Sequence, residues 1–119
     1  MATFDASRML SFDLETTSAN PREARVVTSA LVRIDGSEVD ANETLADPGV
    51  EIPEEAAKVH GITTEKARAG GRDHDEVVGE TIEAIKKGWE DGLTLVVFNA
   101  PYDLTVLRQL TGDFTVTGP

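Results

Sequence analysis

Hydrophobic and polar positions alternate along the first third of the chain, as expected for half-buried strands. Residues 8–15 predict a first strand, and residues 25–34 predict a second one that is rich in β-branched side chains. On the second strand, one face carries Val26, Thr28, Ala30, Val32 and Ile34. Asp35-Gly36 is a tight-hairpin dipeptide, so residues 37–45 are expected to return as an antiparallel partner. The pattern therefore predicts three consecutive antiparallel strands.

The middle of the chain changes to helical spacing. Residues 52–58 predict a short helix with a proline near its start and acids in its first turn. Thr63 is a good N-cap for a second short helix that ends at the glycine pair 70–71. Asp73 or Asp75 opens a longer helix whose apolar positions share one face, namely Val78, Ile82, Ile85 and Trp89.

The last third of the chain predicts one strand and one helix. Residues 93–98 form a continuous apolar run bounded by turn signals, which is typical of a strand buried on both faces. Residues 100–110 predict a helix with three leucines turned inward, and residues 111–119 give no clear assignment. The order of elements predicts a single α/β domain over 1–119, with a mixed sheet of three antiparallel strands plus a parallel strand and flanking helices.

Composition limits the cross-links and metal sites that this domain can form and the compartment in which it is expected. At 119 residues the chain holds one domain at most, and it has no cysteine, which excludes disulfides and thiolate zinc sites. No apolar run approaches the roughly 20 residues that a membrane-spanning helix needs. The first five residues lack the basic-then-apolar order of a secretory signal. We therefore expect a cytoplasmic protein that does not bind a membrane.

The net charge of −11 argues against a protein that holds nucleic acid by neutralising its phosphates. An enzyme that meets nucleic acid through bound metal ions can still be acidic overall. The only basic concentration lies near His60 and comprises Lys58, Lys66, Arg68 and Arg72. A solvated surface of scattered charge explains this group equally well.

Two carboxylates, Asp13 and Glu15, interrupt the apolar run of the first predicted strand. Because side chains alternate across a strand, both point to one face and the apolar residues point to the other. Burying two like charges so close together is costly unless a cation lies between them. Hard divalent ions such as Mg²⁺ prefer carboxylate ligands and keep bound waters. The segment is therefore a candidate metal site at the end of a strand.

A second polar segment follows the predicted strand 93–98. Asp103 falls in the first turn of the following helix, where the helix dipole stabilises an ionised carboxylate, and Asn99 can cap that helix. A purely structural interpretation also fits, because acids in first helical turns and Asn at N-caps are common.

Together these segments resemble the first two motifs of the DEDD family of 3′–5′ exonucleases, the family of the proofreading subunit of bacterial DNA polymerase III. Phe-Asp-Leu-Glu-Thr-Thr at 12–17 is similar to the first motif, an Asp-x-Glu at the end of the first strand. Asn-Ala-Pro-Tyr-Asp at 99–103 is similar to the second, and Val-His-Gly-Ile-Thr at 59–63 resembles a segment of the proofreading branch. The three segments occur in the family's order and span nearly the whole chain.

The resemblance implies an RNase H-like fold and the removal of single nucleotides from single-stranded 3′ ends. Two Mg²⁺ or Mn²⁺ ions would activate a water and stabilise the leaving oxygen. Asp13 would bridge both ions, Glu15 would bind one of them, and Asp103 would hold the second, directly or through water. Neither Mg²⁺ nor Mn²⁺ is favoured, since both prefer oxygen ligands.

The resemblance also implies a set of substrate contacts around the terminal nucleotide, expected at Leu14, Thr16, Thr17, His60, Asn99 and Tyr102. His60 has a plainer interpretation as a turn residue before Gly61. Tyr102 and Phe98 are candidates for stacking or for the pocket wall, although core packing is the stronger expectation for Phe98.

The chain departs from the family after the second motif. The family continues with a His five residues before an Asp, the general base and the fourth carboxylate, whereas no His follows Asp103 here. His60 and His74 both precede it, and Gly79 occupies the position where His74 would need an Asp. Three explanations are a fragment, which we favour and which would lack the C-terminal part of the fold, half of a split enzyme, and a non-catalytic derivative.

Two smaller departures are Ser18, where the family usually has Gly, and Phe98, where a His often precedes the Asn. Without further elements on the sheet, an apolar edge or face should be exposed, so we expect self-association. The expected partners are a single-stranded DNA 3′ end and a DNA polymerase, although the residues do not separate DNA from RNA. The competing interpretations are an inactive exonuclease-like binding module and an acidic α/β domain with accidental matches.

Overall fold

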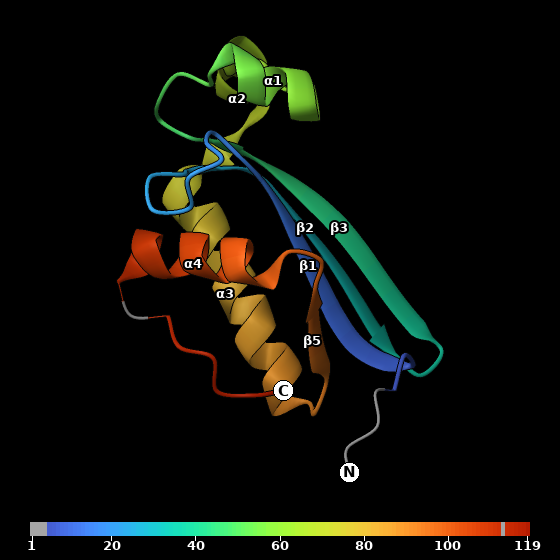
Figure 1. Ribbon diagram of the computed structural model, residues 1–119. Coiled ribbons are helices and arrows are strands. Elements are labelled where there is room, and N and C mark those ends of the chain that lie inside the picture. Colours follow the sequence, from blue (N-terminus) through green and yellow to red (C-terminus); the bar gives the residue numbers. More distant parts are fainter. Residues whose placement is uncertain (1–4, 113) are drawn as a thin grey trace.

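A computed structural model describes residues 5–112 and 114–119, which form a five-stranded mixed sheet with four helices. The strands lie in the order β4-β3-β2-β1-β5 (Figure 1). The three antiparallel strands expected from the alternation are confirmed as β1 (Arg8–Thr16), β2 (Val26–Asp35) and β3 (Glu38–Asp47). β5 (Thr94–Val97) pairs with β1 in parallel, as predicted.

One strand was not predicted. β4 (Arg72–Asp73) pairs with the end of β3 in parallel, so the sheet has five strands rather than four. Two residues are too few to carry a period, and both side chains are exposed, so the sequence offered no signal for this strand.

The helices agree with the helical spacing. They are α1 (Glu54–His60), α2 (Thr64–Gly70), α3 (His74–Glu90) and α4 (Ala100–Thr111). The Thr63 hydroxyl accepts a hydrogen bond from Lys66 N, and the Asp73 carboxylate accepts one from Glu76 N, so both predicted N-caps are confirmed. Among the described helices, none is long and apolar enough to cross a membrane.

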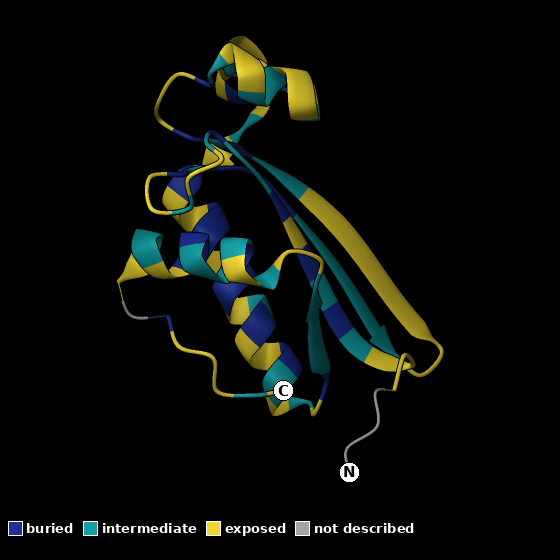
Figure 2. Ribbon diagram, in the orientation of Figure 1, coloured by how far each residue is buried: buried dark blue, intermediate teal, exposed yellow. Residues whose placement is uncertain are grey.

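The main core lies between the sheet and the two long helices, α3 and α4 (Figure 2). Leu10, Phe12 and Leu14 of β1 are buried against these helices, which confirms the predicted alternation on this strand. α3 contributes Val78, Ile82 and Ile85, and α4 contributes Val106 and Leu107.

A second, smaller hydrophobic cluster joins α1 and α2 to the far end of the sheet. Its buried members are Val27, Ile52, Ile62 and Ala67. α1 has no buried residue of its own and α2 has only Ala67, so this pair of helices is lightly packed. In Figure 1 the pair lies beyond the end of the sheet, above the start of α3 and away from α4.

The prediction that residues 93–98 form a strand buried on both faces is wrong. β5 is the edge of the sheet and all four of its residues are only half-buried. Phe98, expected in the core, is 99% exposed. The apolar run was misleading because it spans a buried Leu93, an edge strand and the turn that follows.

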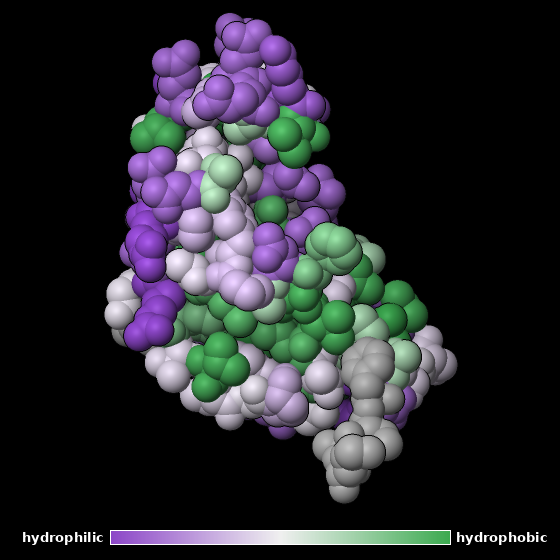
Figure 3. Space-filling view, in the orientation of Figure 1, coloured by the Kyte–Doolittle hydropathy of each residue, from purple (hydrophilic) through white to green (hydrophobic). Residues whose placement is uncertain are grey.

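The last residues lie against the open side of β5. Phe114 is buried and stacks on Trp89 with ring centroids 6.3 Å apart. The Pro119 carbonyl accepts hydrogen bonds from Leu95 N and from Trp89 Nε1, each at 2.8 Å. A shallow apolar groove remains here, and apolar side chains gather around β5 in Figure 3. Its lining includes Leu95, Val97, Leu104 and Val116.

Candidate active site

The carboxylates of the first motif lie on the face of β1 opposite the main core. Asp13 is exposed and Glu15 is half-buried. The expectation that both are buried is therefore wrong, because α3 and α4 cover only the face that carries Phe12 and Leu14. Burial of Glu15 raises the pKa of its carboxyl, Asp13 raises it further, and His60 opposes the shift.

Asp103 is the buried carboxylate of the site. It lies in the first turn of α4 and is only 2% exposed. Burial, reinforced by Asp13 and Glu15, raises its pKa to about 7, against the effect of a hydrogen bond from the Leu14 backbone. Its Oδ2 atom has no hydrogen-bond partner among the described residues. A buried carboxylate with one unpartnered oxygen, close to two others, requires a proton or a cation to offset its charge.

Asn99 precedes α4 at the predicted N-cap position, but its side chain makes no capping hydrogen bond. The expected side-chain cap is therefore wrong. The Asn99 carbonyl instead accepts hydrogen bonds from Tyr102 N at 3.1 Å and from Asp103 N at 3.0 Å. This leaves the side-chain amide of Asn99 available on the wall of a second groove, which Asp13, Glu15 and Asp103 also line.

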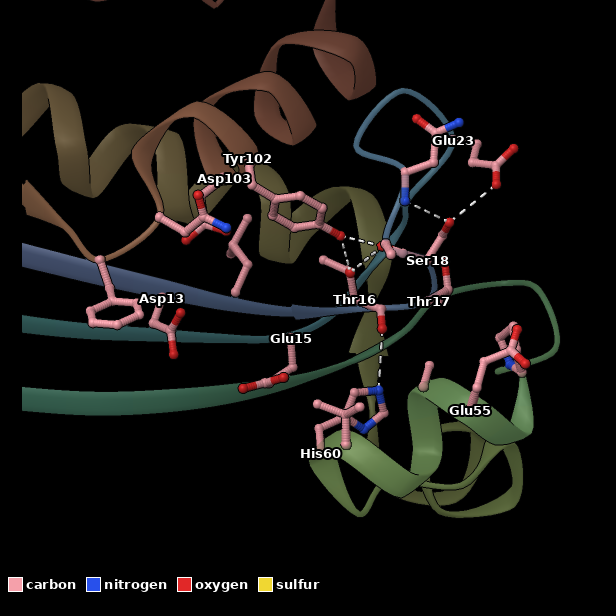
Figure 4. A pocket seen from close by; sticks show the side chains of 18 of the residues that line it. Asp13, Glu15, Thr16, Thr17, Ser18, Glu23, Glu55, His60, Tyr102 and Asp103 are labelled. Atoms are coloured by element: carbon pink, nitrogen blue, oxygen red, sulfur yellow. Dashed lines mark hydrogen bonds between the residues drawn. The ribbon is translucent and has the colours of Figure 1, made fainter.

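Tyr102 links α4 to the chain that follows β1. Its hydroxyl donates to the Ser18 carbonyl and shares a hydrogen bond with Thr16 Oγ1, which also lies 3.0 Å from the Ser18 carbonyl (Figure 4). Burial raises the pKa of the Tyr102 phenol, so the hydroxyl stays protonated and able to donate. These bonds fix the ring as part of the groove wall.

Thr17 is held by the start of β2. Its Oγ1 accepts a hydrogen bond from Arg25 N, and its backbone N–H donates to the Arg25 carbonyl, both at 3.0 Å. Because Thr17 is buried, its hydroxyl serves the β1–β2 connection in this structure. Leu14 also lines the groove although its side chain belongs to the core.

His74 anchors the same connection from α3. It is buried, and its Nε2 accepts a hydrogen bond from Val26 N at 3.0 Å. Its Nδ1 therefore carries the proton and donates to Asp75 Oδ1, also at 3.0 Å, while Arg25 Nη2 lies 3.1 Å from the same nitrogen. His74 thus has a structural position, and it does not line the groove that holds Asp13, Glu15 and Asp103.

His60 lies across the groove from Asp103, at the end of α1 (Figure 4). Its Nδ1 accepts from Ile62 N, so its Nε2 carries a proton and donates to the Thr16 carbonyl, each at 3.2 Å. The hydrogen bond from Ile62 N fits the turn interpretation, and His60 also lines the groove, whereas its contact with the substrate stays a prediction. With both ring nitrogens engaged, His60 has no free lone pair with which to accept a proton from water.

All the predicted site residues line one open groove of about 1270 Å³. One wall comes from β1 and α4, and the other comes from α1 (Figure 4). The lining contains no Lys or Arg among the described residues, and it holds six carboxylates, Asp13, Glu15, Glu23, Glu51, Glu55 and Asp103. Three of these, at 23, 51 and 55, had no sequence signal, because only the tertiary fold brings them to the groove.

The fit of the site to divalent cations rests on two observations. Asp103 Oδ2 is buried and unpartnered, and Asp13 and Glu15 both raise the pKa of this carboxyl. The donors are all carboxylate oxygens, as Mg²⁺ and Mn²⁺ prefer. In the described part of the chain, however, no three acidic or His side chains already converge closely enough to hold an ion. The ligand chemistry fits, while the side chains are not gathered around a common point.

Solved structures share this arrangement of strands and helices. Exonuclease I in its apo form superposes with a TM-score of 0.66 at 22% identity, over 84% of this chain and 23% of that one. Exonuclease I from Methylocaldum szegediense gives 0.66 at 24% identity, over 84% and 22%. At this identity the likeness establishes the fold alone, which is the expected RNase H-like fold.

Sequence comparison gives the family. A DNA polymerase III subunit epsilon-like protein of Rhodobacter capsulatus is 35% identical over 102 residues, or 82% of this chain. The chain spans only 14% of the length of that relative. The sequence model of the RNase T-type exonuclease family matches residues 10–114. This chain, with its carboxylate groove at the ends of β1 and β5, belongs to that exonuclease family.

Proposed function

We propose that this chain carries the metal-binding part of a 3′–5′ exonuclease that hydrolyses single-stranded nucleic acid, with DNA as the first substrate to test. The observation that supports this most directly is the buried, unpartnered Oδ2 of Asp103 beside Asp13 and Glu15. One solved relative, Exonuclease I of E. coli, is described in complex with single-stranded DNA. A polymerase partner follows by analogy with the epsilon-like relative.

Asp13, Glu15 and Asp103 would hold Mg²⁺ or Mn²⁺. When bound, the ions would activate a water and stabilise the leaving oxygen. Asp103 would give up its proton as a cation arrives, because the positive charge offsets the burial and the repulsion that keep its pKa high. The same cations would neutralise a groove whose six carboxylates repel phosphate.

The other predicted residues would position the terminal nucleotide. Tyr102 presents a ring fixed by Thr16 and Ser18, and Asn99 presents a free amide. His60 lies on the opposite wall. The nucleotide would therefore bind between α4 and α1, with its phosphate toward the carboxylates of β1.

One observation favours the alternative of a binding module without turnover. The only His that lines the groove among the described residues is His60, and both its ring nitrogens are engaged. A missing general base would slow hydrolysis by roughly 10²–10⁴-fold. Metal binding would persist in such a module, so metal binding and turnover must be measured separately.

The test is Mn²⁺-dependent release of nucleotides from single-stranded DNA labelled at its 3′ end, with a 5′-labelled strand as the control for polarity. Calorimetry with Mn²⁺ alone runs in parallel. Activity that is lost in Asp13→Ala supports the exonuclease. Mn²⁺ binding without turnover, lost in the same variant, supports the binding module. If the unmodified chain showed no Mn²⁺ binding and no nucleotide release, the proposed function would be overturned.

A further inference from the structure

Phe98 is the most exposed large hydrophobic side chain among the described residues, with 99% of its surface accessible. It forgoes the stabilisation that a Phe gains on burial. The groove beside it offers a reason, since Phe98 is one of the residues that line it. A fully exposed aromatic ring at the rim of a candidate site is suited to contact a ligand.

The register of the sheet places Phe98 next to the first carboxylate. Val97 pairs with Phe12 in the parallel ladder of β5 and β1. Paired side chains point to the same face, and the next position on each strand points to the other. Asp13 is the position after Phe12 on β1, and Phe98 is the residue directly after Val97, in the turn that leads to α4; both line the same groove.

The charge of the groove limits what Phe98 can contact. Six carboxylates line the groove without any Lys or Arg from the described residues, so phosphates gain no attraction from these walls. Bases are neutral and have flat faces that stack on aromatic rings. Val59, 81% exposed, is the other exposed large hydrophobic residue of the lining. Phe98 is therefore the exposed stacking surface at the Asp13 end of the groove.

The place of Phe98 relative to β1 indicates which base of a bound strand it would contact. The terminal nucleotide is proposed to lie by Thr16 and Tyr102, whereas Phe98 lies beside Asp13, three residues and roughly 10 Å earlier on the strand. Figure 4 shows Asp13 and Thr17 toward opposite ends of the groove. We propose that Phe98 is a stacking platform for the penultimate base, on the 5′ side of the nucleotide that is removed; this inference rests on the proposed function.

The test uses a short single-stranded DNA that carries 2-aminopurine at either the penultimate or the terminal position, with a phosphorothioate at the last linkage to prevent hydrolysis. In the presence of Mn²⁺, the intact protein is expected to quench the penultimate probe by stacking. Phe98→Ala should abolish that quenching, leave the terminal probe quenched, and weaken DNA affinity roughly tenfold. Phe98→Trp should retain the quenching, because it keeps the aromatic face.

Val39→Ala is the matched control, because Val39 is exposed on β3 and lies outside the groove. It should change neither probe. Equal penultimate quenching in Phe98→Ala and in the unmodified chain, with DNA still bound, would overturn the stacking assignment alone. If the unmodified chain bound no DNA in Mn²⁺, the proposed function would fall together with it.

Discussion

Asp103 is the most buried of the three motif carboxylates in the candidate site. Its carboxyl is buried, one oxygen has no partner, and two neighbouring carboxylates oppose its ionisation. Such a group stores an electrostatic cost that a bound cation removes. The folded chain is therefore strained at this position when it is free of metal and at high pH.

This strain predicts how stability depends on pH. An unfolded Asp titrates near 3.9, whereas folded Asp103 titrates at about 7. Between these values the folded state keeps a proton that the unfolded state has lost, so raising the pH lowers the free energy of unfolding, by at most roughly 4 kcal/mol. Urea unfolding at pH 5 and pH 8 without metal should show this loss in the unmodified chain and a smaller loss in Asp103→Asn.

Mn²⁺ at pH 8 should restore stability to the unmodified chain but not to Asp103→Asn. Asp40→Asn is the control, since Asp40 is exposed on β3 and outside the groove. The same pH dependence in Asp103→Asn as in the unmodified chain would show that other groups cause it.

His74 gives a second prediction at this scale. His74→Ala leaves Val26 N–H without its acceptor and opens a cavity, so the free energy of unfolding should fall by about 2–4 kcal/mol. Asp75→Ala removes only the exposed partner of Nδ1 and should cost less than about 1 kcal/mol. Thermal or urea denaturation of the two variants would separate these contributions, and equal losses would contradict the assignment.

At the scale of elements, the sequence predicted every helix and the four longer strands. The reason is local, because alternation at Leu10, Phe12 and Leu14 and the caps at Thr63 and Asp73 need no knowledge of the fold. The features that the sequence did not predict depend on contacts between distant elements: the edge position of β5, the exposure of Phe98 and the two-residue β4. The carboxylates of the motifs were recognisable, whereas the exposure of Asp13 and the burial of Asp103 depend on how the helices cover the sheet.

The junction of α2 and β3 predicts the effect of two glycine substitutions. A Cβ on Gly71 would clash with Ala67 O and lie 2.5 Å from Asp47 N, both backbone atoms that cannot easily move. Gly71→Ala should therefore destabilise the fold by about 2 kcal/mol or more. Gly79 in α3 has open space around it, so Gly79→Ala should stabilise by about 0.5–1 kcal/mol. Melting temperatures of the pair would check this, and a stable Gly71→Ala would contradict the close approach.

At the scale of the whole molecule, the surface carries two grooves of different chemistry. The carboxylate groove lies between α1 and α4, while the apolar groove runs along β5 and the last residues of the chain. The first repels phosphate unless cations are bound, and the second offers apolar surface to another protein.

Self-association through the apolar groove remains a prediction. Val116 lines this groove and is 53% exposed, so Val116→Lys should shift the chain toward monomer in sedimentation velocity. Val39→Lys, which places the same charge on β3 outside this groove, should leave the distribution unchanged. A monomer mass that does not vary with concentration in the unmodified chain would contradict the prediction.

The two separate hydrophobic clusters have a consequence for temperature. One wall of the carboxylate groove rests on the main core beneath α4, and the other rests on the small cluster beneath α1 and α2. Elements with few buried contacts open locally at lower free energy than the core does. On warming, amide protons of α1 and α2 would exchange with solvent before those of the sheet. The groove would then lose its second wall, and with it the proposed binding of a nucleotide, while the circular dichroism spectrum would still be that of a folded chain.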